Sequence, residues 1–175
     1  MKKIWILAAG ILMAACGTNN QAGNTAASPV VAKDTTAYPF TATYSSNITV
    51  PGNVQYAHIV LDVWRAFEMN SIQSKRSSFA DTVTYDDASG FKFHGPADSL
   101  LAFANRDISG LDSLRFDIST WQSAHVNDKN EDWINIWSTE RRYPKKGKAD
   151  TSLIQENWRV KDGKIVYFNQ FKAHL

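Results

Sequence analysis

Cysteine is almost absent from this chain, since Cys16 is the only one among 175 residues. Once Cys16 is modified, no thiol remains for a disulfide, a nucleophile or a metal site. The four histidines include no pair four residues apart, which is the spacing of a two-histidine metal site on a helix. The sequence also lacks a glycine-rich phosphate loop and a serine or cysteine nucleophile motif. We therefore expect neither a metal nor a cofactor.

The sequence also has little net charge. The sequence holds 19 Lys and Arg against 17 Asp and Glu, and without Lys2 and Lys3 the two signs are equal. Nucleic-acid binding needs an excess of clustered basic side chains, so nucleic acid is not an expected partner. The basic cluster at residues 141–146 is interpreted as a hairpin turn exposed to solvent.

The longest apolar run lies at the N-terminus and is too short to span a bilayer. Lys2 and Lys3 are followed by the uncharged residues 4–15, about a dozen where a membrane span needs roughly 20. A positive start, an apolar run and a small-residue exit are typical of a secretory signal peptide. Because the exit ends at Cys16, the segment resembles a bacterial lipoprotein signal. The alternative is an ordinary signal peptide with a chance cysteine.

The lipoprotein resemblance predicts where the protein is found. It implies cleavage before Cys16, a diacylglyceryl thioether on the sulfur and an acyl chain such as palmitate on the new amino group. Two or more chains hold a protein stably on a membrane, whereas one binds marginally. We expect a lipid-anchored protein of the cell envelope. Residues 17–20 carry no acidic run, which favours the periplasmic side of the outer membrane.

Composition divides the mature chain into three parts. Residues 16–37 are rich in Asn, Ala, Thr and Ser and predict a flexible tether. Residues 38–52 predict an extended arm packed on the domain through Tyr38, Phe40 and Tyr44. Residues 53–175 are long enough for one folded domain with its own core.

The order of expected elements indicates an α+β domain. Three- and four-residue spacing of apolar side chains predicts a helix at residues 53–70, followed by shorter helices near 71–80 and 95–109. Alternation predicts strands at 82–86, 91–94, 114–126, 132–142, 151–160 and 164–172. Asp162-Gly163 is the signature of a tight hairpin between the last two strands. Helices segregated from an antiparallel sheet are typical of this class.

Three stretches together resemble the nuclear transport factor 2-like fold in its SnoaL-like branch. They are Phe79-Ala80-Asp81-Thr82-Val83-Thr84-Tyr85-Asp86 with the following Phe93-His94-Gly95, then Asp132-Trp133-Ile134-Asn135-Ile136-Trp137, then Glu156-Asn157-Trp158-Arg159-Val160 and the turn after it. The resemblance implies a curved antiparallel sheet wrapped on three helices into a cone (a cystatin-like roll), with one internal pocket. It also implies a homodimer through the outer sheet face. The family includes isomerases, polyketide cyclases, dehydratases and members without a known reaction.

The resemblance also suggests two carboxyls for acid/base chemistry. Asp86 falls at the base position of the isomerases, with Asp87 as the alternative register, and Glu156 falls at the second-acid position. Such chemistry needs one ionised carboxyl and one kept neutral by burial. The family's tyrosine position falls near Val63 or Trp64, neither of which carries a hydroxyl. Alternatively, Asp86 ends its strand in a turn and Glu156 pairs with an arginine.

The sequence has more aromatic side chains than a small core needs. This predicts an apolar pocket lined by aromatic rings, with the polar ends of Tyr and Trp side chains among them. The candidate ligand-binding residues are Trp64, Phe67, Phe93, His94, Trp121, Trp137, Trp158 and Tyr167. Our first hypothesis is therefore a membrane-anchored domain that binds a small, largely apolar molecule without catalysis. The alternatives are an isomerase, cyclase or dehydratase using Asp86 with Glu156, and a dimeric scaffold module.

Overall fold

The structure is a computed structural model that describes Pro39 and residues 41–175. The predicted signal peptide, the tether with Cys16, and Tyr38 and Phe40 of the arm lie outside the described residues. Residues 41–175 form one compact unit. In this part of the chain, no helix is long and apolar enough to cross a membrane.

The helices form where the apolar stripes predict them. Helix α1 (Val54–Glu68) is capped by Asn53, whose side chain accepts a hydrogen bond from the backbone N–H of Gln55 at 3.0 Å. The expected second helix is a single 3-10 segment, η1 (Ile72–Ser78). Helix α2 (Ala97–Ser109) begins directly after Pro96, which is its N-cap.

Seven strands form one sheet in the order β1-β4-β5-β6-β7-β2-β3. Their bounds are β1 Ile48–Thr49, β2 Phe79–Asp87, β3 Lys92–Pro96, β4 Leu111–Val126, β5 Glu131–Pro144, β6 Asp150–Lys161 and β7 Lys164–His174. The expectation of a wholly antiparallel sheet is wrong at one place, because β2 and β7 pair in parallel. These strands are distant in sequence, so no hairpin turn fixes their relative direction.

Two local features of the long strands match their sequence signals. Strand β4 runs through the whole predicted range 114–126, with a register shift typical of a β-bulge between Ile118 and Thr120. Asp162 and Gly163 both have positive φ, 50° and 73°, as a two-residue hairpin turn between β6 and β7 requires.

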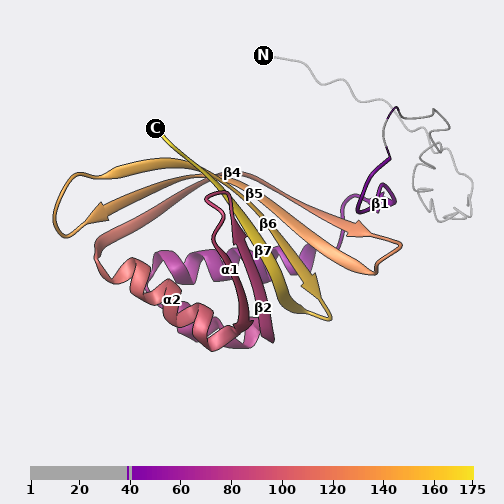
Figure 1. Ribbon diagram of the computed structural model, residues 1–175, viewed down its shortest axis with the longest axis horizontal. Helices are drawn as coiled ribbons and strands as arrows, with labels where there is room; N and C mark the ends of the chain where they lie inside the picture. The colour runs from indigo at the N-terminus through magenta and orange to yellow at the C-terminus, as the bar shows by residue number, and fades with distance from the viewer. Residues whose placement is uncertain (1–38, 40) are drawn as a thin grey trace, which may run out of the picture. The chain divides into compact units, whose positions relative to one another are not determined.

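The sheet curves around α1 and α2, which lie on its inner face (Figure 1). Alternation along the central strands points one set of apolar side chains inward, where they form the core with α1 and α2. This set includes Ile134, Ile136, Ile154, Trp158 and Val160, each at most 4% exposed. The opposite, outer face carries no helix among the described residues.

The described part of the arm lies along β4 and contributes β1, the edge strand next to it. Ile48 and Thr49 pair with Val126 and His125. The ring of Tyr44 packs edge-on against Trp133 with ring centroids 5.9 Å apart, and its hydroxyl donates a hydrogen bond to Glu131. Backbone and side chains thus both hold residues 44–49 against the sheet.

Candidate functional site

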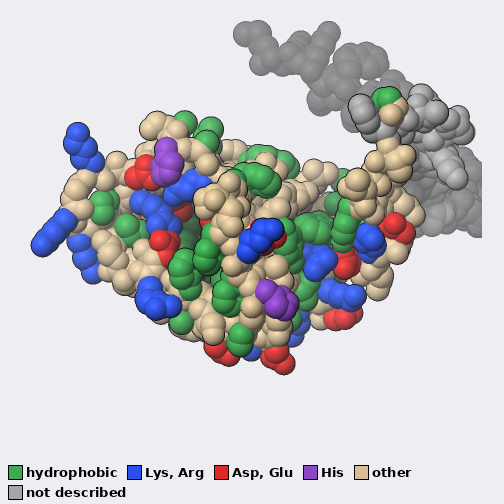
Figure 2. Space-filling model, in the orientation of Figure 1, with side chains coloured by type: hydrophobic (Ala, Val, Ile, Leu, Met, Phe, Trp, Pro, Cys, Tyr) green, Lys and Arg blue, Asp and Glu red, His purple; other side chains and the backbone are tan. Residues whose placement is uncertain are grey.

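A cavity of about 140 Å³ lies between the helices and the inner face of the sheet. A cavity of about 150 Å³ with apolar walls is known to admit benzene, so this one has the size of a single ring. Figure 2 shows apolar side chains exposed among charged ones over β2, β3 and α2, on the face in view. The cavity is lined by Val63, Trp64, Phe67, Ile72, Phe79, Tyr85, Leu100, Leu101, Phe103, Ala104, Asp107, Phe116, Glu140, Arg142, Glu156, Trp158, Phe168 and Gln170.

Glu156, 6% exposed, is one of two buried carboxyls that line this pocket, the other being Glu140. Trp158 Nε1 donates a hydrogen bond to its Oε2 at 2.8 Å, and Gln170 Nε2 donates to its Oε1 at 2.7 Å. Strand geometry brings these groups together, because Glu156 is paired with Gln170 across β6 and β7, and Trp158 is two residues further on the same face. Burial raises the pKa of Glu156 to about 7, although both hydrogen bonds oppose the rise.

Two further polar groups border the same pocket. The indole N–H of Trp64 lies near enough to Glu156 to favour its carboxylate form, and within residues 41–175 it has no hydrogen bond of normal geometry. Tyr85 lies on β2 with its ring 4.6 Å from that of Phe168. Burial raises the pKa of Tyr85, and the charge of Glu156 raises it further, so its hydroxyl stays protonated at neutral pH.

Ion pairs form the other polar part of the lining. Glu140, 2% exposed, accepts hydrogen bonds from Arg142 Nε at 2.9 Å and from Lys172 Nζ at 2.6 Å. The two terminal nitrogens of Arg142 bind both carboxylate oxygens of Asp107 at 3.1 and 2.6 Å. This bidentate contact joins the last turns of α2 to β5 at the border of the cavity.

Four of the residues predicted from the sequence meet at the cavity, namely Trp64, Phe67, Glu156 and Trp158. Asp86 is not among the lining residues. Its neighbour Tyr85 lies inward, and alternation turns Asp86 to the outer face, where it accepts a hydrogen bond from the hydroxyl of Tyr167 at 3.2 Å. Tyr167 therefore also lies outside the pocket.

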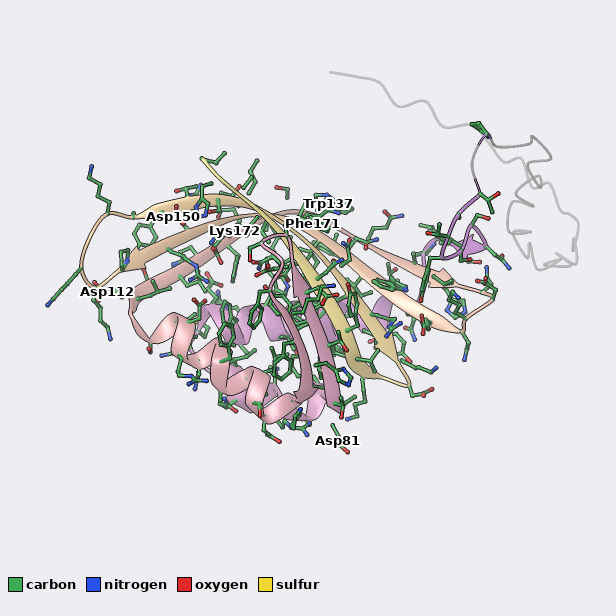
Figure 3. All side chains as sticks on the ribbon, in the orientation of Figure 1. Asp81, Asp112, Trp137, Asp150, Phe171 and Lys172 are labelled. Carbon is green, nitrogen blue, oxygen red and sulfur yellow. The ribbon has the colours of Figure 1, made fainter. Side chains whose placement is uncertain are left out.

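The other predicted lining residues are also placed elsewhere. Phe93 packs against the core without bordering the cavity. His94 is exposed and bonds Thr84 at 2.9 Å. Trp121 is 53% exposed on β4. Trp137 lies on the outer face of the sheet (Figure 3), because it alternates with the inward-facing Ile136.

Hydrogen bonds show where the carboxyls of Asp86, Asp87 and Glu156 lie and which groups they contact. The turn that Asp86 was expected to make belongs to Asp87, whose Oδ1 accepts hydrogen bonds from the backbone N–H groups of Ser89 and Phe91 at 2.8 and 3.0 Å. The hydroxyl of Ser89 also donates to Asp87, and these hydrogen bonds lower its pKa. Glu156 has Trp158 and Gln170 as partners where an arginine was the alternative.

Sequence reasoning missed five polar lining residues, Tyr85, Asp107, Glu140, Arg142 and Gln170. The alternation of side chains along β5 was a signal for two of these five, Glu140 and Arg142. They lie on the same face of the strand as the buried Ile134 and Ile136. Among the described residues, no group of three His, Cys, Asp or Glu side chains is arranged to hold a metal ion.

Comparison of the sequence with family models and with curated proteins gives no match. Solved structures, in contrast, share the fold. An LEH-like epoxide hydrolase of M. tuberculosis superposes with a TM-score of 0.57 at 11% identity, over 69% of this chain and 84% of that one. An NTF2-like protein of unknown function from Burkholderia pseudomallei gives 0.55 at 18% identity, over 66% and 88%.

A third similar structure is a candidate SnoaL-like polyketide cyclase from Shewanella putrefaciens, with a TM-score of 0.54 at 9% identity over 69% and 79% of the two chains. At such identities the likeness establishes architecture and leaves activity open. The curved sheet and the helices on its inner face agree with these neighbours: the domain has the α+β fold that they share, the nuclear transport factor 2-like fold.

Proposed function

We propose that the protein binds a small, largely apolar molecule of about one ring in this cavity, and that binding without catalysis is its function. The walls are mostly aromatic and aliphatic, with a few convergent polar groups at fixed positions, as in small-molecule sites generally. A cavity of about 140 Å³ in an otherwise packed core is the space that such a ligand would occupy.

The observation that carries the proposal is the cavity itself, a space of about 140 Å³ enclosed mainly by aromatic and aliphatic side chains. The indole N–H of Trp64 is buried at its border beside Glu156, and within residues 41–175 it has no hydrogen bond of normal geometry. Glu156 beside it offers a second polar contact, so a bound molecule would be oriented as well as enclosed.

Filling the cavity tests this function. We expect native mass spectrometry of the protein purified from its own cells to show a retained small molecule. Ala104→Phe should remove that mass, because Ala104 lines the cavity. Ala102→Phe is the matched control on the exposed side of the same helix. No retained mass, or the same mass in both variants, would contradict the proposal.

The proposed function includes a location for the protein at the membrane. We propose that Cys16 is lipidated and holds the binding domain at the membrane on the residue 16–37 tether, which supports a role in capturing or carrying a molecule in the cell envelope. Cys16→Ser should move the protein from the membrane fraction to the soluble fraction. Retention in the membrane fraction would contradict the anchor.

An acid/base enzyme is the second candidate, and the pKa of Glu156 favours it. A carboxyl with a pKa of about 7 can both take and give a proton near neutral pH. Neighbours of this fold that are named as an epoxide hydrolase and as a candidate cyclase support the same class. In this candidate Glu156 would act without Asp86, which lies across the sheet. Turnover that survives Glu156→Gln would exclude it.

A dimeric scaffold is the third candidate, supported by the outer sheet face. Leu153 and Phe171 are 50% and 48% exposed there, and they border a shallow groove with Trp137. We propose that a second copy of the chain covers this face. The proposal is compatible with ligand binding, because the groove and the cavity lie on opposite faces of the sheet.

A further inference from the structure

The carboxyl of Glu156 has hydrogen-bond donors around it but no cation beside it among residues 41–175. Trp158 and Gln170 each donate one hydrogen bond to Glu156, and the indole N–H of Trp64 lies close. Within residues 41–175, no Lys, Arg or His side chain comes within ion-pair distance of Glu156. Glu140, in contrast, has two cations at 2.9 and 2.6 Å. Glu140 is thus balanced by opposite charge, and Glu156 is not.

The cations at the pocket, Arg142 and Lys172, already form ion pairs. Arg142 uses Nε for Glu140 and both terminal nitrogens for Asp107. Lys172 binds the same Glu140. An anionic ligand would therefore find no uncommitted cation among the described lining residues, and would meet three carboxyl groups. The charge of the lining opposes anions and favours a cation at Glu156.

The walls around Glu156 suit an organic cation. The rings of Trp158 and Phe168 stack with centroids 4.1 Å apart and planes within 6° of parallel. Trp64 and Phe116 pack with centroids 4.6 Å apart. These ring pairs place an apolar surface beside Glu156, and opposite charges attract more strongly against such a surface than in water. A carboxyl set among aromatic walls therefore offers both a counter-charge and an apolar surface.

We propose that this pocket selects a small protonated amine, with its ammonium group against Glu156 and its apolar body against the aromatic walls. This inference rests on the proposed binding function and names the ligand class. The ammonium group would supply the missing counter-charge and hold Glu156 as a carboxylate, because an opposite charge within about 4–6 Å stabilises the ionised form. The cavity volume of about 140 Å³ limits the body of the amine to about one ring.

Three probes of matched size test the inference on the full chain: benzylamine, benzyl alcohol and benzoate. We expect benzylamine to bind at least about tenfold more tightly than benzyl alcohol, and benzoate to bind most weakly. Equal or tighter binding of benzyl alcohol or benzoate would overturn the amine selectivity and leave the binding function standing. Failure of all three probes to bind would contradict both.

Glu156→Gln tests whether Glu156 causes the preference for benzylamine over benzyl alcohol. Glu156→Gln keeps the size of the side chain and removes its charge, so we expect its benzylamine affinity to fall at least about tenfold, to near that of benzyl alcohol. Asp112→Asn is the matched control, because Asp112 is exposed outside the cavity lining (Figure 3). Loss of selectivity in both variants, or in neither, would overturn the assignment to Glu156.

Proton release gives a second readout that needs no variant. At about pH 6, Glu156 is largely protonated in the free protein, so binding of benzylamine should release close to one proton per site. Calorimetry in two buffers of different ionisation enthalpy measures this number. No release would contradict contact between the ammonium group and Glu156. The other titratable groups facing the site are Tyr85 on β2, Asp107 on α2, Glu140 and Arg142 on β5, and Lys172 on β7.

Discussion

Replacing Glu156 by glutamine should remove a large part of the pH dependence of stability between about pH 4.5 and pH 7. Burial raises the pKa of Glu156 from 4.5 to about 7. In that interval the folded protein keeps a proton that the unfolded chain has lost. The free energy of unfolding therefore falls as pH rises, by about 1.4 kcal/mol per pH unit, and the total loss is about 3 kcal/mol. The stabilisation is complete below the unfolded pKa and is gone above the folded one.

Urea unfolding of the wild type and of Glu156→Gln across this pH range measures the effect. We expect the wild type to lose about 3 kcal/mol more than the variant, because glutamine fills the same space and does not ionise. Asp112→Asn should follow the wild type, since this acid is exposed. If the wild-type and Glu156→Gln curves run parallel, Glu156 does not titrate as a buried acid and the reasoning is refuted.

Three further changes probe the ion pairs, the arm and the outer face. Arg142→Ala should lower the free energy of unfolding by about 3 kcal/mol, because it leaves the buried Glu140 with one cation, whereas Arg141→Ala breaks an exposed pair and should cost under about 1 kcal/mol. Equal losses in urea unfolding would contradict this. Gly52→Ala should destabilise by about 1–3 kcal/mol, since its Cβ would lie 2.5 Å from the β4 backbone, and an unchanged melting temperature would argue against that close approach. Phe171→Asp should convert the proposed dimer into a monomer in light scattering, and an unchanged mass would exclude this face as the interface.

Most of the fold follows from patterns that depend on local geometry. Helix α1 forms from one apolar stripe, and Ala57, Val60 and Trp64 of that stripe are buried. The hairpin at Asp162-Gly163 follows from the need for positive φ at both positions. The parallel pairing of β2 with β7 could not be predicted in this way, because it joins strands about 80 residues apart and leaves no local signal.

The site was harder to predict than the fold, because one residue of register decides which face a strand side chain occupies. Glu156 and Trp158 share a face by alternation, and the structure brings both to the cavity. Asp86 differs from Tyr85 by one position and lies on the opposite face. Trp137 lies on the outer face for the same reason, although its size suggested a pocket wall.

The most direct test of the central claim is to observe the Trp64 indole N–H while a ligand enters the cavity. In a ¹⁵N-labelled sample, we expect titration with benzylamine to shift the Trp64 and Trp158 indole resonances in a saturable way. The resonance of Trp121, which is 53% exposed, should stay in place. Trp64→Phe assigns the signal. If the Trp64 resonance moves with none of benzylamine, benzyl alcohol and benzoate, or moves no more than that of Trp121, the cavity is not a binding site.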